Sequence, residues 1–290
     1  MRFFFPFVAY TWILLALSPL SSIASPLLES RAGGIPQSTF DDLVRYTKYS
    51  SAVYQWICPN PLGNTLVAKF SNSGTQGFVV RDNERKEIVV AFRGSLEVID
   101  ALVDLQIIMR PLKSTGVTGV GDAYVHSGFL FAYNVVSSDV LGIVRSQLAT
   151  YPGYSIVITG HSLGGSVASI AALSIQAAHP SISIKLYTYG KPTGNAAFAS
   201  LVESRIGVNN IHRAVHTHDG VPTILFKVLG YRHFATEYWN FQDPATPTNV
   251  KKCSGGDDPS CSDSIFSGGI NIPHISYFGQ AIALNPLLCL

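Results

Sequence analysis

The segment 155–165 constrains the fold of this chain more than any other stretch. It reads Ser-Ile-Val-Ile-Thr-Gly-His-Ser-Leu-Gly-Gly, and a run of small and apolar residues follows it over 166–173. The β-branched residues favour a strand and the later run favours a helix, so we predict a strand, a sharp turn and a helix. A Gly-x-Ser-x-Gly match is informative only in that context. Gly160 and Gly164 lie where backbone segments are expected to approach each other closely.

A serine in such a turn is a candidate nucleophile. The strained connection lifts the Ser162 hydroxyl clear of the sheet and aims the backbone N–H of Leu163 toward the place where an oxyanion would form. The alternative is a glycine-rich helix start without chemistry, because the pattern also occurs by chance. The strand before the turn and the helix after it favour the catalytic interpretation.

The rest of the chain indicates an α/β protein with a mostly parallel sheet. In addition to the strand before Ser162, short strands are predicted at 65–70, 77–80, 87–92, 185–189 and 211–215. Helical patterns lie between several of these strands, and such alternation is typical of a parallel sheet.

Two helical patterns and one irregular region complete this outline. Apolar residues recur at helical spacing over 98–105, which predicts an amphipathic helix of about two turns. A longer helical pattern covers 130–148 and stops before Pro152. From 231 to about 271 the chain is rich in predicted loops, and a C-terminal helix is predicted after His274.

Composition narrows the class of protein. The chain has 290 residues, of which 47% are hydrophobic and 13% charged, as expected for one globular domain, here 36–290. The formal net charge is +2 and no basic run is present, which argues against nucleic acid as a partner.

Residues 1–24 read as a secretory signal peptide. An apolar stretch over 3–20 precedes small residues around Ala24 of the kind that a signal peptidase cleaves. A membrane anchor is the alternative, but two prolines interrupt the stretch and no positive stop-transfer flank follows it. We therefore predict a secreted, extracellular protein without a transmembrane segment after signal removal. Residues 25–35 are a propeptide or a disordered start, and both interpretations stay open.

The exported part contains four cysteines, Cys58, Cys253, Cys261 and Cys289. An even number in an oxidising compartment suggests two disulfides, for which three pairings exist. Cys253 and Cys261 flank a Gly-Gly-Asp-Asp-Pro turn that a bond would close, and a bond from Cys58 to Cys289 would then tie the start of the domain to its end. No Cys-x-x-Cys spacing occurs, so no metal site is predicted.

An activated serine needs a base, and the base needs an acid that orients it. In hydrolases of this architecture the acid follows the serine along the chain and the base follows the acid. Asp219 comes soon after the predicted strand 211–215 and is the candidate acid, although Asp-Gly is also a common turn. His233 and His274 follow it, and order alone leaves both open as the base. The other histidines considered are expected to be structural or surface residues: His126, His161, His212, His216 and His218.

Several blocks of sequence occur in the same order as in a known family. They are 92–95 (Phe-Arg-Gly-Ser), 125–129, 160–165, 187–192, 218–222, 237–239 and 274–279. The chain resembles the fungal class 3 lipases, which are secreted triacylglycerol lipases grouped with fungal feruloyl esterases. The resemblance covers roughly 35–290. It implies an α/β-hydrolase fold, with a mostly parallel central sheet, helices on both faces and a lid helix.

The same resemblance implies roles for individual residues. Ser162 would be the nucleophile, Asp219 the acid and His274 the base, which decides between the two histidines. Ser95 would be the oxyanion-hole serine and would donate through its N–H and its hydroxyl, together with the backbone N–H of Leu163. The disulfide pairs implied are Cys58–Cys289 and Cys253–Cys261.

The helix after Ser95 is similar to the lid of these lipases. Asp104 matches the family aspartate that fixes the hydroxyl of the oxyanion-hole serine. The apolar face of the lid helix would consist of Val98, Ala101, Leu102 and Leu105. Ala101 stands where a tryptophan is often found, and this departure bears on the strength of interfacial activation.

The expected activity is hydrolysis of triacylglycerols through an acyl-enzyme at a lipid–water interface. We expect a monomer that needs no metal or organic cofactor. Two alternatives stay open: a soluble carboxylesterase or feruloyl esterase of the same family, and a secreted binding protein on an inactive hydrolase scaffold. The presence of the candidate residues Ser162, Asp219, His274 and Ser95 argues against the second alternative.

Overall fold

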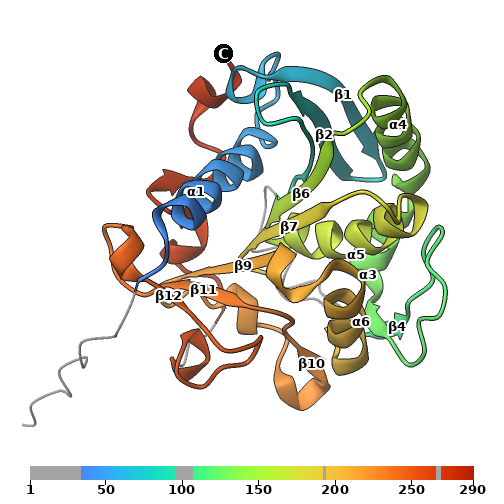
Figure 1. Ribbon diagram of the computed structural model, residues 1–290. Helices are drawn as coiled ribbons and strands as arrows, with labels where there is room; N and C mark the ends of the chain where they lie inside the picture. The colour runs from blue at the N-terminus through green and yellow to red at the C-terminus, as the bar shows by residue number, and fades with distance from the viewer. Residues whose placement is uncertain (1–33, 96–106, 192–193, 266–268) are drawn as a thin grey trace, which may run out of the picture. The chain divides into compact units, whose positions relative to one another are not determined.

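An eight-stranded sheet forms the centre of the protein, in the order β1-β2-β3-β6-β7-β9-β11-β12 (Figure 1). Its strands are β1 (Thr65–Asn72), β2 (Thr75–Asp82), β3 (Glu87–Phe92), β6 (Ser155–His161), β7 (Ile184–Tyr189), β9 (Ile211–His216), β11 (Glu237–Asn240) and β12 (Val250–Lys252). Neighbouring strands run parallel from β3 to β11, and the outer pairs are antiparallel. The prediction of a mostly parallel sheet is confirmed.

The computed structural model describes residues 34–95, 107–191, 194–265 and 269–290. All of them belong to one compact unit, Gly33–Leu290. The predicted signal peptide lies outside the described residues and stays a prediction. Among the described residues no single helix has the length and apolar composition needed to cross a membrane. The bent pair Ser127–Asn134 and Ser137–Thr150 has them only when the two helices are counted together.

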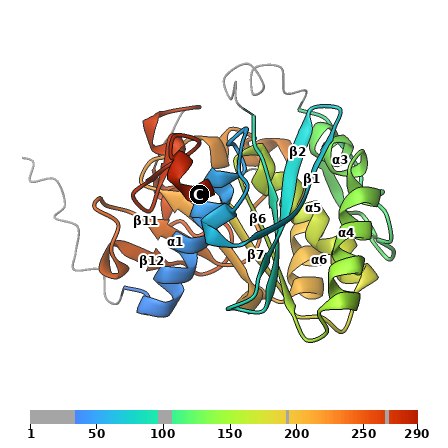
Figure 2. The ribbon, with the colours of Figure 1, turned by 90° about the horizontal axis from the view of Figure 1, so that it is seen from above.

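Helices cover both faces of the sheet, as Figure 2 shows. Helix α1 (Gln37–Ala52) lies on one face. The helices of the other face are α3 (Ser127–Asn134), α4 (Ser137–Thr150), α5 (Leu163–Ala178) and α6 (Ala196–Ile206). In β3, Ile88 and Val90 pack toward α3–α6, whereas Val89 and Ala91 pack toward α1. This alternation with a period of two gives the sheet an apolar core on each side.

Short strands complete the fold around the sheet. A four-stranded sheet has the order β10-β8-β5-β4. Its strands are β4 (Met109–Pro111), β5 (Tyr124–His126), β8 (Gly194–Asn195) and β10 (Tyr231–Arg232). Near the C-terminus β13 (Ser276–Tyr277) pairs with β14 (Gln280–Ala281), and a short 3₁₀ helix, η8 (Pro286–Cys289), follows.

The structure corrects the prediction of one long helix over 130–148. This segment is divided into α3 and α4, which meet at a bend of 50°. Near the break the hydroxyl of Ser137 donates to the carbonyl of Asn134 at 3.0 Å. In a continuous helix this carbonyl would accept from a backbone amide, so the side chain replaces a helical hydrogen bond.

In the last third of the chain one strand was missed and one predicted helix is absent. Within the loop-rich segment 231–271, β11 pairs in parallel with β9 inside the main sheet. The first residue of β11 is a buried glutamate, Glu237. Its charge interrupts the apolar pattern of the strand, and the guanidinium of Arg213 on β9 neutralises that charge at 2.8 Å. The segment after His274 forms the β13–β14 pair, not a helix.

Candidate active site

The turn between β6 and α5 has the predicted shape. Ser162 has φ 57° and ψ −132°, a backbone conformation that residues other than glycine rarely adopt. Its amide donates to the carbonyl of Tyr189 at 2.8 Å, which ties the turn to β7. A Cβ added to Gly160 would overlap the carbonyl of Gly164, and one added to Gly164 would overlap the carbonyl of Phe92. The turn therefore requires glycine at both positions.

The two candidate oxyanion donors adjoin this turn. Ser95 follows the end of β3, and the residue before it, Gly94, is so close to the turn that an added Cβ would lie 3.2 Å from the Cβ of Ser162. Leu163 is the first residue of α5, where backbone amides have no partner inside the helix. Both backbone amides are thus near the serine that they are predicted to serve.

Asp219 and His274 form a buried pair. Asp219 follows the end of β9, and His274 lies in the 3₁₀ helix η7 (Ile272–Ile275). Nδ1 of His274 is 2.9 Å from one carboxylate oxygen of Asp219 and 3.2 Å from the other, and both side chains are fully buried. Two segments far apart in the sequence thus meet as an acid and a base would.

Asp219 is held in its ionised form. Burial by itself raises the pKa of this carboxyl, but the charge of His274 and hydrogen bonds to the carboxylate outweigh burial and lower the pKa below its usual value. The hydrogen bonds come from His274, from the hydroxyl of Tyr277 and from the backbone N–H of Val221, the last at 2.9 Å. An ionised acid at this position can stabilise a positively charged imidazole.

Tyr277 is a further site residue, for which no role was predicted. Its hydroxyl donates to Asp219, and in the sequence it is marked by its place in the block 274–279, three residues after His274. Gly190 makes room for this group. It has φ 56°, and a Cβ there would lie 2.6 Å from both a carboxylate oxygen of Asp219 and the hydroxyl of Tyr277.

The second ring nitrogen of His274 points away from Asp219. This Nε2 atom is buried and has no hydrogen-bond partner among the described residues. The ring of His161, the residue before Ser162, has its centroid 4.5 Å from that of His274. The imidazole therefore lies at the same end of the sheet as the serine, and catalytic hydrogen bonds often form fully only when a substrate binds.

His233, the other candidate base, lies in different surroundings. Burial lowers the pKa of its imidazole well below the usual value, and the positive charges of Arg213, Lys191 and Lys227 lower it further. Such neighbours disfavour the imidazolium that a base must form, whereas Asp219 favours it at His274. The structure brings Asp219 together with His274.

The candidate lid residues and the predicted partner of Ser95 lie within 96–106, outside the described residues. They stay predictions, and they are Val98, Ala101, Leu102, Asp104 and Leu105.

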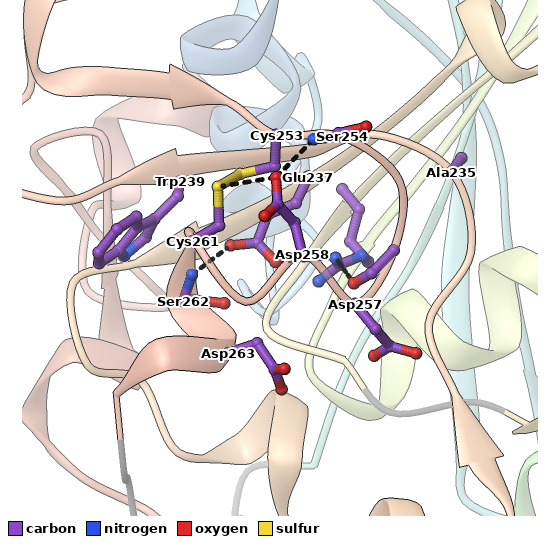
Figure 3. Close-up of polar contacts among 12 residues, drawn as sticks. Ala235, Glu237, Trp239, Cys253, Ser254, Asp257, Asp258, Cys261, Ser262 and Asp263 are labelled. Atoms are coloured by element: carbon purple, nitrogen blue, oxygen red, sulfur yellow. Dashed lines mark hydrogen bonds and ion pairs between the residues drawn. A yellow bond between two sulfur atoms is a disulfide. The ribbon is translucent and has the colours of Figure 1, made fainter. Parts of the chain in front are cut away.

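Both predicted disulfides are present, Cys58–Cys289 and Cys253–Cys261. The second is buried beside Glu237, and these three residues have the spacing of a metal site (Figure 3). The two sulfurs are bonded to each other and so are not thiolate ligands. The carboxylate of Glu237 binds Arg213 and accepts from the backbone N–H of Ser262 at 3.0 Å. This cluster is structural.

The strand order, the serine turn after β6 and the acid–base pair after β9 define an α/β-hydrolase. A family model described as lipase (class 3) matches residues 89–229. A secreted alkaline triacylglycerol lipase of Penicillium cyclopium is 31% identical over 93% of this chain and 94% of its own length. The chain belongs to the class 3 lipase family and is a carboxylic ester hydrolase.

Solved structures agree with this family. A triacylglycerol lipase from Penicillium expansum superposes with a TM-score of 0.81 and 29% identity, over 87% of this chain and 97% of the other. A triacylglycerol lipase whose catalytic centre is formed by a serine protease triad superposes with a TM-score of 0.75 and 30% identity, over 87% and 98% of the two chains.

Proposed function

We propose that this chain is a secreted lipase that hydrolyses triacylglycerols at a lipid–water interface through an acyl-enzyme on Ser162. The observation that carries the proposal is the buried pair of Asp219 and His274 at the same end of the sheet as the strained turn of Ser162. The relatives support the substrate class, since the three similar proteins described above are triacylglycerol lipases, one of them secreted. The two disulfides fit an oxidising, extracellular environment.

The proposed reaction begins with proton transfer from Ser162 to Nε2 of His274 as the serine oxygen attacks the ester carbonyl. Asp219 keeps the imidazole in the required tautomer and stabilises the imidazolium. The amides of Ser95 and Leu163 bind the oxyanion, and such donors contribute about 3–4 kcal/mol each. His274 then protonates the departing alcohol, and the serine retains the acyl group.

Water completes the cycle by the same route. His274 takes a proton from water, the resulting hydroxide attacks the acyl-enzyme, and the proton returns to Ser162 as the fatty acid leaves. In the second half the oxyanion forms at the same place, so one set of donors serves both steps. These steps use side chains, backbone amides and water.

The interfacial part of the proposal concerns segment 98–105. Its apolar positions, Val98, Ala101, Leu102 and Leu105, would contact lipid when the lid opens, and the site beneath would then accept an acyl chain. We further propose that the enzyme acts as a monomer, because none of the proposed steps needs a second copy of the chain.

Hydrolysis of tributyrin across its solubility limit tests both parts. We expect the rate to rise sharply when droplets appear, and we expect Ser162→Ala to lose activity by about 10⁶-fold. Ser169→Ala is a matched control, since this buried serine lies in α5 and its hydroxyl donates to the carbonyl of Gly165 at 2.8 Å. It should retain the rate of the unmodified enzyme.

Each part can fail separately. A rate that saturates below the solubility limit would show a soluble esterase, and hydroxycinnamate esters would then be the substrates to test. Equal rates for Ser162→Ala and the unmodified enzyme would overturn the proposed mechanism. A phosphonate that leaves Ser162 unlabelled would indicate an inactive scaffold.

A further inference from the structure

The bond to Asp219 fixes only one point of the His274 side chain. Asp219 holds Nδ1, whereas Nε2 has no partner among the described residues. A ring held at one atom can still pivot about that atom, and a general base misplaced by about 1 Å can lose about 10²-fold in rate. The direction in which the side chain leaves the backbone must therefore also be set.

His161 contacts the backbone on one side of the base. Its Nε2 lies 2.7 Å from the carbonyl oxygen of His274, and its Nδ1 lies 3.0 Å from the hydroxyl of Tyr54. His161 is fully buried, and burial lowers the pKa of its imidazole to about 3, with a further contribution from His274. The ring is therefore neutral and carries a single N–H.

The partners decide which nitrogen of His161 carries that proton. A carbonyl can only accept, so Nε2–H donates to His274 and Nδ1 accepts from the hydroxyl of Tyr54. The oxygen of Tyr54 in turn accepts from the backbone N–H of Gly94 at 3.1 Å. One chain of hydrogen bonds thus runs from the residue before Ser95 to the backbone of the base.

His216 contacts the backbone on the other side of the base. It is the last residue of β9, and its Nδ1 lies 3.0 Å from the carbonyl oxygen of Pro273, the residue before His274. Its Nε2 lies 3.1 Å from the carboxylate of Asp243, which is 62% exposed. The carbonyl accepts, so Nδ1–H of His216 is the donor of this bond.

The geometry points to His161 and His216 as a pair of positioning residues for the base. One holds the peptide group before the Cα of His274 and the other holds the peptide group after it, at 3.0 and 2.7 Å. Together they set φ and ψ of His274 and so the direction of its Cα–Cβ bond. Asp219 then fixes the far end of the side chain, and Nε2 has one place to lie.

The two contacts use different ring nitrogens, which provides a crossed test. A glutamine amide reaches about as far as Nε2 of an imidazole, and an asparagine amide about as far as Nδ1. His161→Gln should therefore keep the bond to His274 and His161→Asn should lose it. At position 216 the order is reversed, because His216→Asn keeps the bond to Pro273 and His216→Gln loses it.

The measurement is kcat and KM for p-nitrophenyl butyrate below its solubility limit, per active site titrated with a phosphonate. We expect His161→Asn and His216→Gln to lower kcat about tenfold, the effect of one lost buried hydrogen bond, with KM unchanged. We expect His161→Gln and His216→Asn to stay within about threefold of the unmodified enzyme. Titration restricts the comparison to folded molecules.

His212→Gln is the matched control. It lies on the same strand as His216, and its ring stacks on Tyr187 at 4.4 Å and on Tyr238 at 5.1 Å, away from the base. Its kcat should equal that of the unmodified enzyme. The inference is overturned if glutamine is the better replacement at both positions 161 and 216, or if asparagine is. It is also overturned if all four variants keep full kcat.

This inference rests on the proposed function, because it gives His161 and His216 a role only if His274 is the base. The two can fail separately. If Ser162→Ala keeps its activity, the proposed function fails whatever the histidine variants do. If Ser162→Ala is inactive and the crossed pattern is absent, the positioning pair alone is wrong.

Discussion

The two halves of the active site are positioned by different means. Ser162 lies in a turn whose shape follows from backbone packing, with β6, α5 and β3 so close that Gly160 and Gly164 have no room for a side chain. His274 lies in a single turn of 3₁₀ helix. It is placed by hydrogen bonds that its backbone region accepts from His161 and His216 and by the bond that its Nδ1–H donates to Asp219. We call the turn at Ser162 between β6 and α5 the serine turn, and the 3₁₀ helix η7 (Ile272–Ile275) the base loop.

The difference predicts how each region responds to change. In the serine turn the essential feature is close backbone packing that leaves no room for a side chain, so a single added methyl group should disturb the fold itself. In the base loop the essential features are polar contacts, so a substitution of similar size should leave the fold intact and reduce the rate. The expected effects on folding and on rate decrease from the serine turn to the hydrogen bond between Tyr277 and Asp219.

Gly164→Ala tests the serine turn. The added Cβ would overlap the carbonyl of Phe92, a backbone atom that cannot move without displacing β3. We expect little folded protein, or a free energy of unfolding lower by at least about 3 kcal/mol. Thermal unfolding followed by circular dichroism measures the effect.

Gly142→Ala is the control for that prediction. Gly142 lies in α4, and an added Cβ there meets no atom within 4 Å. Alanine should stabilise this helix by about 1 kcal/mol relative to glycine. If both variants behaved alike, close packing would not be what shapes the serine turn.

This contrast also explains how much of the site could be predicted from the sequence. The serine turn is encoded locally, since a strand pattern, two glycines and a helix pattern are contiguous, and its predicted shape is confirmed. Asp219 could be placed at the end of β9 for the same reason. In this part of the chain local pattern and tertiary structure agree.

The base loop is encoded by contacts between distant segments, and its prediction was less complete. Order along the chain left His233 and His274 open, and the family resemblance decided between them. β11 was missed because its buried glutamate is neutralised by Arg213, which belongs to another strand. His161 and His216 were assigned no chemistry, because a histidine that binds a distant carbonyl has no local signature.

Asp219→Asn tests the acid after β9 that binds His274 of the base loop. An asparagine amide cannot stabilise the imidazolium, and it favours the wrong tautomer of His274, so kcat should fall by about 10⁴-fold. The fold should persist, because the side chain has nearly the same size. Steady-state hydrolysis of p-nitrophenyl butyrate and a thermal unfolding curve measure the two effects. Asp139→Asn, at an exposed site in the first turn of α4, should leave the rate unchanged.

The Cys58–Cys289 disulfide tests how far the base loop depends on the chain that follows it. This bond spans 231 residues and joins the segment after the base loop to the segment after α1. Replacing both cysteines by serine should lower the free energy of unfolding by about 2–5 kcal/mol. The kcat per titrated site should be unchanged, because the contacts of His274 come from β6, β9 and Asp219. A drop in kcat without loss of folded protein would contradict this view.

Tyr277→Phe is expected to have the smallest effect, and it tests the hydrogen bond from the Tyr277 hydroxyl to Asp219, the acid that binds His274. The Tyr277 hydroxyl is one of the groups that lower the pKa of Asp219, so its removal should raise that pKa. Ionised Asp219 is needed for catalysis, and the acidic limb of the profile of kcat against pH should therefore move to higher pH. At neutral pH the carboxylate stays ionised, and we expect kcat to fall only about threefold, less than for a fully lost hydrogen bond.

The pH dependence of the free energy of unfolding should also change in Tyr277→Phe. Because the pKa of Asp219 is lowered in the folded protein, its contribution to stability is present above the pKa of an unfolded aspartate and is lost as the pH falls through the folded-state value. In Tyr277→Phe the folded-state pKa is higher and the unfolded one unchanged, so the contribution of Asp219 should be smaller and its loss should be complete at a higher pH. Tyr46→Phe is the control, since its hydroxyl donates at 2.7 Å to Glu87, a carboxylate in another part of the fold. It should cost stability without moving the acidic limb, and an equal shift in both variants would show that the limb does not report on Asp219.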